Sequence, residues 1–175
     1  IPDALAALAD DDSSVQLLVI EILRELDPIE ASLPPLIHAL EDPDRIVRIA
    51  AVEPVARFGE KAQAAVPVLK TWLDDKQEHV RIAAAIAIVK IDPTKTPEVM
   101  PVLLDGLRSE HSIDRANAAY AIGDLGEAGS GALPMLEELL VDECAAPRCE
   151  AASAISKITG NPLTEISVGV ELLRA

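Results

Sequence analysis

The sequence contains very few aromatic residues and only two cysteines. Phe58, Trp72 and Tyr120 are all of its aromatic side chains, so the core must be built from small aliphatic residues, which suit closely packed helices. Cys144 and Cys149 are too few for a disulfide framework in 175 residues. They form a lone C-x4-C without the second pair of a structural zinc site, and we expect unpaired thiols.

Basic residues and long apolar segments are also scarce. The chain has 15 Lys and Arg against 30 Asp and Glu, a formal net charge of −15. This negative charge repels phosphate backbones and anionic membrane surfaces, so we expect a neutral or basic partner and no nucleic acid. No apolar run approaches the ~20 residues of a membrane span, and no signal segment opens the chain. These absences favour a soluble protein, with the cytoplasm as the preferred compartment.

What the sequence does contain is an internal repeat. Five prolines are separated by 32, 33, 34 and 33 residues: Pro2, Pro34, Pro67, Pro101 and Pro134. Leucine always stands six residues after the proline, and apolar residues recur seventeen and twenty-four residues after it. This spacing is helical rather than strand-like. Each repeat therefore predicts a short helix that begins near its proline, an acidic turn, and a longer second helix.

The repeat predicts an all-α fold, a right-handed α-solenoid of about five helix pairs in which each pair is stabilised mainly by its neighbours. The predicted boundaries are 1–32, 33–65, 66–99, 100–132 and 133–161. Residues 162–175 are predicted to form a partial sixth helix or a C-terminal cap. Because the chain begins with Ile1 rather than Met, we expect a fragment or domain of a larger protein.

Three local features of the helices follow from residue type. The repeated prolines fit first helical turns, where a missing N–H costs no hydrogen bond. Asp44 and Ser112 have the residue types and positions of N-caps. Pro54 falls inside the second helix of the second repeat, where it would leave the carbonyl of Ala50 without a donor. We therefore expect a kink or break at that residue.

Two segments in the repeat carry a family resemblance. "EDPDRIVRIAAVEPVARFGE" and "DDKQEHVRIAAAIAIVKID" resemble the HEAT-like repeats of the bilin lyase type, in which Asp and Val-Arg precede alanines and a hydrophobic close. The resemblance extends over roughly 160 of the 175 residues. Tetratricopeptide repeats rely on aromatic packing positions that this chain lacks, and the Thr-Pro-Leu-His motif of ankyrins is absent.

A column of arginines accompanies the repeat. Arg48, Arg81, Arg115 and Arg148 each stand fourteen residues after their proline, and Gln16 takes this position in the first repeat. Aspartates recur eight residues after the proline, with Ser109 in their place in the fourth repeat: Asp10, Asp42, Asp75 and Asp142. We expect each guanidinium to bridge turn carboxylates of adjacent repeats, with a weaker joint at Ser109. Anion binding is the alternative role for these arginines.

No motif indicates catalysis, a metal or a cofactor. His38, His79 and His111 stand at different positions within their repeats and should not share a face. The acidic turns lack the glycine and terminal glutamate of a calcium loop. "GEAGSGALP" has the same length as "GEKAQAAVP", so it is an inter-repeat connector rather than a nucleotide-binding loop. We therefore expect no catalytic residue, metal ligand or cofactor.

The second helices should leave one stripe on the concave side, at positions fifteen, nineteen and twenty-two after each proline. In the third repeat this stripe is apolar, with Ile82, Ile86 and Val89. The expected partner-binding patch adds residues from the neighbouring repeats and its rim: Tyr120, Glu53, Arg57 and Lys90. An apolar patch with a charged rim is typical of a protein interface. The alternative is that curvature or another part of the protein covers these side chains.

These features predict a non-catalytic scaffold that binds another protein or a peptide. The resemblance implies an alternative, a bilin lyase or a chaperone subunit associated with one. Similar repeats occur in many unrelated proteins, and a fold does not convey an activity.

Overall fold

The structure, a computed structural model, describes residues 5–10 and 12–161, and every regular element in these ranges is helical. The predicted all-α class is therefore confirmed. The chain divides into two units, residues 1–75 with 83–95 and residues 76–82 with 96–175. The predicted terminal helix at 162–175 lies outside the described residues.

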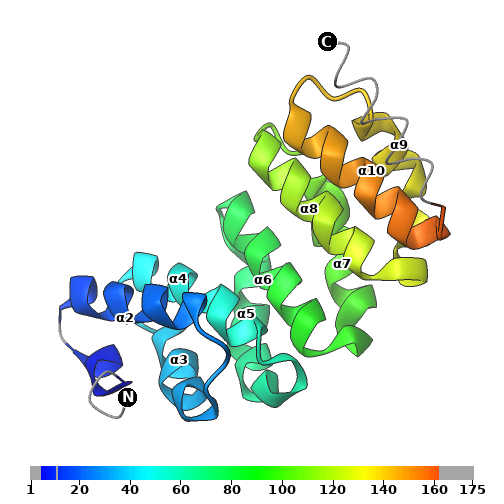
Figure 1. The fold of residues 1–175 in the computed structure, drawn as a ribbon. Coiled ribbons are helices and arrows are strands. Elements are labelled where there is room, and N and C mark those ends of the chain that lie inside the picture. Colours follow the sequence, from blue (N-terminus) through cyan, green and yellow to red (C-terminus); the bar gives the residue numbers. More distant parts are fainter. Residues whose placement is uncertain (1–4, 11, 162–175) are drawn as a thin grey trace. The chain divides into compact units, whose positions relative to one another are not determined.

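The first unit contains short helical segments before and between its longer helices (Figure 1). In chain order these are η1 (Ala7–Ala9), α2 (Ser13–Glu25), η2 (Glu30–Ser32), α3 (Leu33–Ala39), α4 (Arg45–Ala56), η3 (Gly59–Ala65), α5 (Val66–Thr71) and η4 (Trp72–Asp74). Helix α6 (Glu78–Ile91) is divided between the two units after Ile82, and η5 (Pro93–Lys95) follows it. Helices α2 and α4 pack against each other, and α3 packs against α4.

The second unit has the same alternation of helices. It contains α7 (Thr96–Gly106), α8 (Ser112–Asp124), η6 (Gly126–Ala132), α9 (Leu133–Leu139) and α10 (Ala145–Thr159). Helix α10 packs along α8 and against α9, and α7 packs against α8 (Figure 1). The two long helices α8 and α10 therefore form one surface of this unit.

The second helices keep the spacing of the repeat. All five begin eleven residues after a repeated proline, at Ser13, Arg45, Glu78, Ser112 and Ala145. The prolines also begin first helices, because Pro34, Pro67 and Pro134 occupy the first turns of α3, α5 and α9. Helix α7 is the exception, since it begins at Thr96 and places Pro101 in its interior. The residues just before Pro101 are α-helical and belong to α7, whereas the 3-10 helices η2, η3 and η6 stand just before the first helices that contain the other three prolines.

The helix N-termini confirm one predicted cap and correct another. The Asp44 side chain accepts a hydrogen bond from the Ile46 N–H (2.8 Å), as expected of an N-cap. Ser112 is the first residue of α8 rather than its cap, because His111 takes the N-cap position and makes no side-chain bond there. His111 stands ten residues after its proline, as the N-caps Asp12, Asp44 and Cys144 do in their repeats, and Ser112 is one residue beyond that position.

The predicted break at Pro54 is absent. Helix α4 continues through Pro54 to Ala56, and the Arg57 N–H still bonds the Glu53 carbonyl (3.1 Å). Proline at this point removes a single hydrogen bond within the last turn, which the helix tolerates more easily than a loss in its middle. The side chain of Pro54 is buried and contributes to packing.

Aliphatic side chains and close helix contacts make up the core. Ile20, Leu36 and Leu40 are fully buried in the first unit, and Ile122 and Leu136 are fully buried in the second. Burial of each such side chain contributes about 1.5–3 kcal/mol. Helices α8 and α10 approach closely at Gly123, where a Cβ atom would lie 2.7 Å from the Ala154 Cα. Glycine and alanine at this crossing therefore set the separation of the two helices.

Candidate interaction surface

Each second helix exposes the same side. The residues twelve after each proline are all exposed, and so are the residues twenty-three after it: Ser14, Ile46, His79, Ile113 and Ala146, then Glu25, Arg57, Lys90, Asp124 and Lys157. Positions sixteen and nineteen lie between these two, so all four positions follow one side of a helix. We call this side the second-helix face.

The predicted exposure of the apolar stripe at positions fifteen, nineteen and twenty-two is wrong in part. Ile82 is 2% exposed and Val89 is 8% exposed, while Ile86 is half-buried. The Ile82 side chain fills the space beside Gly106, where a Cβ atom would lie 2.9 Å from the Ile82 Cδ1. Gly123 occupies the position that corresponds to Val89 and lies against Ala154. In the third repeat positions fifteen and twenty-two are therefore buried, and the exposed face is rotated by about one residue from the prediction.

A groove opens on the second-helix face of the second unit. Its volume is about 360 Å³, and it is lined by Ile113, Ala116, Asn117 and Tyr120 of α8 and by Ala146 and Glu150 of α10. Ile113 is 71% exposed and Tyr120 is 39% exposed. The groove therefore offers apolar side chains to a ligand, together with an amide and a carboxylate.

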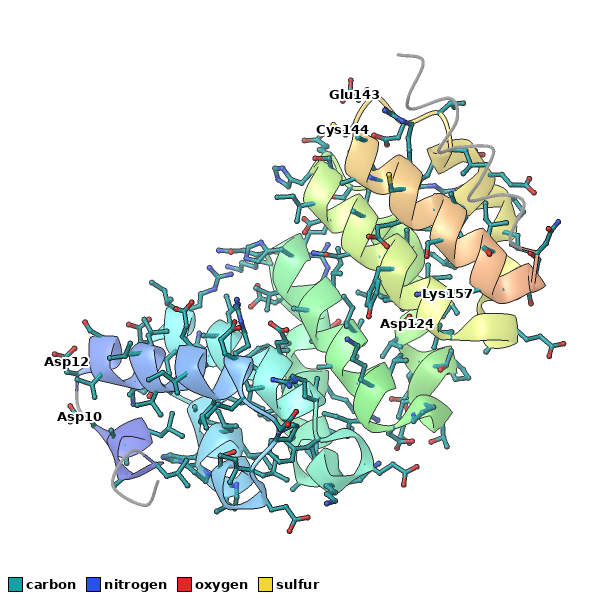
Figure 2. All side chains as sticks on the ribbon, viewed as in Figure 1. Asp10, Asp12, Asp124, Glu143, Cys144 and Lys157 are labelled. Atoms are coloured by element: carbon teal, nitrogen blue, oxygen red, sulfur yellow. The ribbon has the colours of Figure 1, made fainter. Side chains whose placement is uncertain are left out.

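Two charged side chains, Asp124 and Lys157, lie beside Tyr120 at the margin of this groove. The Lys157 ammonium lies 2.9 Å from the Asp124 carboxylate and 5.0 Å from the centre of the Tyr120 ring. Figure 2 shows Asp124 and Lys157 beside each other at the C-terminal ends of α8 and α10. Hydrogen bonding to Asp124 raises the pKa of Tyr120 and that of Lys157, so both keep their protons. These contacts fix the tyrosine ring at the groove margin.

Three other predicted partner-binding residues belong to the second-helix face but not to this groove. Glu53 lies 3.7 Å from Arg24 across the α2–α4 seam, and both side chains are largely exposed. The Arg57 guanidinium donates to the Arg24 carbonyl. Lys90 is exposed near the end of α6. Their part in partner binding stays a prediction.

The arginine column lies beside the acidic turns. Arg115 donates from Nε and Nη2 to the two carboxylate oxygens of Asp142 (2.7 and 2.8 Å) and from Nη1 to the Ser109 carbonyl (2.8 Å). The paired side chains are only 11% and 8% exposed. The bond lowers the pKa of Asp142 and raises that of Arg115. Arg115 thus joins the turn before α8 to the turn before α10.

The other three arginines bind carbonyls of the turn that precedes their own helix. Arg48 donates to the carbonyls of Asp42 and Pro43, Arg148 donates to those of Asp142 and Glu143, and Arg81 donates to that of Lys76. Asp42 and Asp142 also close their own turns, since each accepts the N–H of the residue two positions later. A bridge at every joint, including one that involves Asp75, stays a prediction.

Ser109 replaces the turn aspartate without leaving the turn open. Its hydroxyl oxygen accepts the His111 N–H (3.2 Å), as the aspartates do in their turns. The same hydroxyl donates to the Glu78 carboxylate (2.7 Å), and Ser109 is 4% exposed. The bonding partner at this joint is thus a glutamate on α6.

Four groove residues were missed by the sequence prediction: Ile113, Asn117, Ala146 and Glu150. The sequence did contain a signal for Ile113. Ile46 and Ile113 share a position that carries polar or small residues in the other repeats. Both are large exposed aliphatic residues in the structure, at 65% and 71%. The groove itself depends on the helix separation that Gly123 and Ala154 set, which periodicity does not specify.

The described ranges contain no group of three or more His, Cys, Asp or Glu side chains that could hold a metal ion. None of the helices in those ranges combines the length and apolar character of a membrane span. Cys144 and Cys149 are free thiols, half-buried and exposed respectively.

Sequence comparison identifies one matching family. A family model for HEAT repeats matches residues 1–88 and 33–123, which together span 1–123. Among curated proteins, no sequence matches this chain significantly.

Solved structures with the same fold include natural and designed repeat proteins. The complex of CpcE and CpcF of phycocyanin lyase from Nostoc sp. PCC7120 has a similar chain, with 24% identity and a TM-score of 0.70 over 92% of this chain. The match covers 65% of that chain, so the present chain spans less than two thirds of its length. A designed armadillo repeat protein is 21% identical, with a TM-score of 0.69 over 97% of this chain and 88% of its own.

A second designed armadillo repeat protein, in complex with the peptide (KR)4, is 20% identical with a TM-score of 0.63. The match covers 89% of this chain and 80% of that one. These likenesses confirm the predicted solenoid class of the fold.

Proposed function

The chain belongs to the family of HEAT-repeat proteins, and on this premise we propose that it is a non-catalytic scaffold that binds another protein or a peptide through the second-helix face. The predicted resemblance to HEAT-like repeats is confirmed by the family match. We further propose the division into five repeats over residues 1–161, which the common start of the five second helices supports.

The groove between α8 and α10 is the observation that carries this proposal. It places an exposed isoleucine and a half-exposed tyrosine beside small residues, with Glu150 in its lining. Tyrosine is frequent among residues that dominate interface energies, because it buries a large area at little entropic cost. The ion pair of Asp124 and Lys157 already holds this ring, so little side-chain freedom is lost on binding.

The charge of the chain favours a neutral or basic ligand. The net charge of −15 attracts cationic segments at long range. A solved structure of the same fold holds the basic peptide (KR)4, which supports a peptide of this charge as a ligand class for the fold. We therefore propose a segment with an aliphatic or aromatic anchor and basic flanks as the occupant of the groove.

Fluorescence anisotropy with labelled peptides tests this proposal. Peptides that share one aromatic anchor would carry lysine, serine or glutamate flanks. We expect binding in the order basic, neutral, acidic, and at least a tenfold loss for Tyr120→Ala and for Glu150→Lys with the basic peptide. Glu143→Lys makes the same charge change in a turn outside the groove lining and should cost much less. Equal losses for the two lysine variants would show that net charge alone drives binding.

A lyase-associated role is the second candidate. It rests on the likeness to a chain of the CpcE–CpcF complex of phycocyanin lyase, at an identity that shows the fold alone. Incubation of the protein with a linear tetrapyrrole and an apoprotein acceptor tests it. A visible absorption band that stays with the acceptor after denaturation would support a lyase or chaperone role. No band leaves the scaffold proposal in place.

A further inference from the structure

Glu150 is the carboxylate that lines the groove between α8 and α10, and it is half-buried there. The raised pKa values of Tyr120 and Lys157 come first from Asp124, and the charge of Glu150 adds to both, so Glu150 lies near these two groups. Within the described ranges, however, the Glu150 side chain makes no hydrogen bond or ion pair. This carboxylate is therefore available to a cation that a ligand supplies.

Asp124, the other carboxylate beside Tyr120, already has its partners. Its carboxylate oxygen lies 2.9 Å from the Lys157 ammonium, and the Tyr120 hydroxyl donates a hydrogen bond to it. The charged groups with the largest effect on the tyrosine are thus two carboxylates and one ammonium, a net charge of one negative unit. A ligand that brings one positive charge would make this cluster neutral.

Apolar surface lies directly beside Glu150. Ile113 and Ala146 stand twelve residues after their prolines, and both are exposed in the groove. Glu150 stands sixteen residues after its proline, which is one helical turn or about 6 Å further along the groove. A ligand side chain that follows this part of the groove needs an apolar stem and a cationic tip, a combination that lysine and arginine offer.

The polar groups of the groove favour arginine over lysine. Asn117 stands at the same position of its repeat as Glu150, and it lines the groove from α8. Its side chain, too, makes no hydrogen bond within the part of the chain that the structure describes. A guanidinium can donate two hydrogen bonds to a carboxylate and further ones to an amide oxygen, whereas an ammonium is a point charge that holds its water more strongly. Acceptors on both helices therefore match the planar donor group of arginine.

We propose that Glu150 and Asn117 are specificity-determining residues of the groove, which select an arginine from the basic flanks of the bound segment. The guanidinium pairs with the Glu150 carboxylate and donates to the Asn117 amide oxygen, and the arginine stem lies on Ile113 and Ala146. Tyr120 is left to the aliphatic or aromatic anchor of the segment. This selection rests on the proposed function of the groove, and it adds the identity of one ligand residue and of the two side chains that recognise it.

Fluorescence anisotropy with three peptides that differ in one residue type tests the proposal. They share one aromatic anchor and outer flanks of serine, and they carry arginine, lysine or citrulline on both sides of the anchor. Citrulline has the shape of arginine without its charge. We expect the wild-type protein to bind the arginine peptide about tenfold more tightly than the citrulline peptide, with the lysine peptide between them.

Groove variants and a matched control assign the effect to these side chains. Glu150→Gln keeps the shape of the side chain and should weaken binding of the arginine peptide about tenfold, while it leaves the citrulline peptide unaffected. Asn117→Ala should reduce the preference for arginine over lysine. Glu150→Arg should prefer a peptide with glutamate beside the anchor to the arginine peptide. Glu143→Gln removes the same charge from an exposed turn outside the groove lining and should change each affinity by no more than about twofold.

Three outcomes would overturn the proposal. These are equal binding of the arginine and citrulline peptides by the wild-type protein, equal binding of the arginine and lysine peptides, and equal losses for Glu150→Gln and Glu143→Gln. In each of these cases, weaker binding of the citrulline peptide by Tyr120→Ala would leave the proposed function of the groove standing. Binding of none of the peptides would overturn the proposed function together with the selection of arginine.

Discussion

The α2–α4 joint and the α8–α10 joint solve one bonding problem with different side chains. In the first, Gln16 donates to the Leu8 carbonyl (3.2 Å) and to the Asp42 carboxylate (2.9 Å). In the second, Arg115 binds both oxygens of Asp142 and the Ser109 carbonyl. Both residues stand fourteen positions after their proline. At these two joints the residue at this position is a donor that connects its own repeat to the turn of the next.

The two donors differ in charge and in the number of bonds that they make to the next turn. Glutamine makes one bond to the next turn, whereas the guanidinium makes a bidentate, charge-assisted pair. Gln16 is 7% exposed, and Arg115 is nearly as well covered. The joint with arginine should thus be stronger, and it should also depend on pH.

The largest effect is expected for Arg115→Ala. The change leaves the buried Asp142 carboxylate without its partner, and breaking a pair of this kind costs about 3 kcal/mol. Urea denaturation followed by circular dichroism measures the loss. Arg115→Gln copies the α2–α4 joint and should recover part of the stability. If Arg115→Gln and Arg115→Ala are equally unstable, the two joints are not equivalent.

Gly123→Ala should have the next largest effect. The new methyl group would lie 2.7 Å from the Ala154 Cα, so α8 and α10 must separate, at a cost of about 2 kcal/mol. The corresponding residue of α2 is Arg24, whose side chain is largely exposed, so the α2–α4 joint does not depend on such an approach. Gly131→Ala, which has no atoms within 4 Å of the new methyl group, is the matched control for urea denaturation. Equal stability of these two variants would contradict the close-approach argument.

Gln16→Ala should have a smaller effect, about 1 kcal/mol, because neutral hydrogen bonds contribute less than charged ones. The Leu8 carbonyl and the Asp42 carboxylate would each lose one donor. The same denaturation experiment measures it beside Arg115→Ala. A loss as large as that of Arg115→Ala would show that the carboxylate needs a donor, charged or not.

Periodicity predicted the helix pairs and the arginine column because both repeat at a fixed interval. Each second helix begins eleven residues after its proline, and the bridge from Arg115 to Asp142 joins the residue types that the column predicted. The sequence did not predict which side of the second helices is exposed, because this depends on which small residues lie at the contacts between helices. Gly106 receives Ile82, and Gly123 lies against Ala154. Ser109 illustrates the same limit, since its hydroxyl takes over the turn bond that a carboxylate makes elsewhere.

The smallest loss of stability is expected from acid. Protonation of Asp142 weakens its pair with Arg115 but leaves both side chains in place. The Arg115 guanidinium lowers the pKa of Asp142 below its value in the unfolded chain. The unfolded state therefore binds this proton more readily, and the stability that the pair contributes is complete above the ordinary aspartate pKa of about 3.9. It is lost as the pH falls below that value and through the lowered pKa. Since Asp44 and Asp92 also have lowered pKa values, the informative quantity is the wild-type unfolding free energy minus that of Arg115→Gln. We expect this difference to be constant near neutral pH and to shrink in acid, and a difference that is the same at every pH would mean that the bidentate pair is no stronger for its charge.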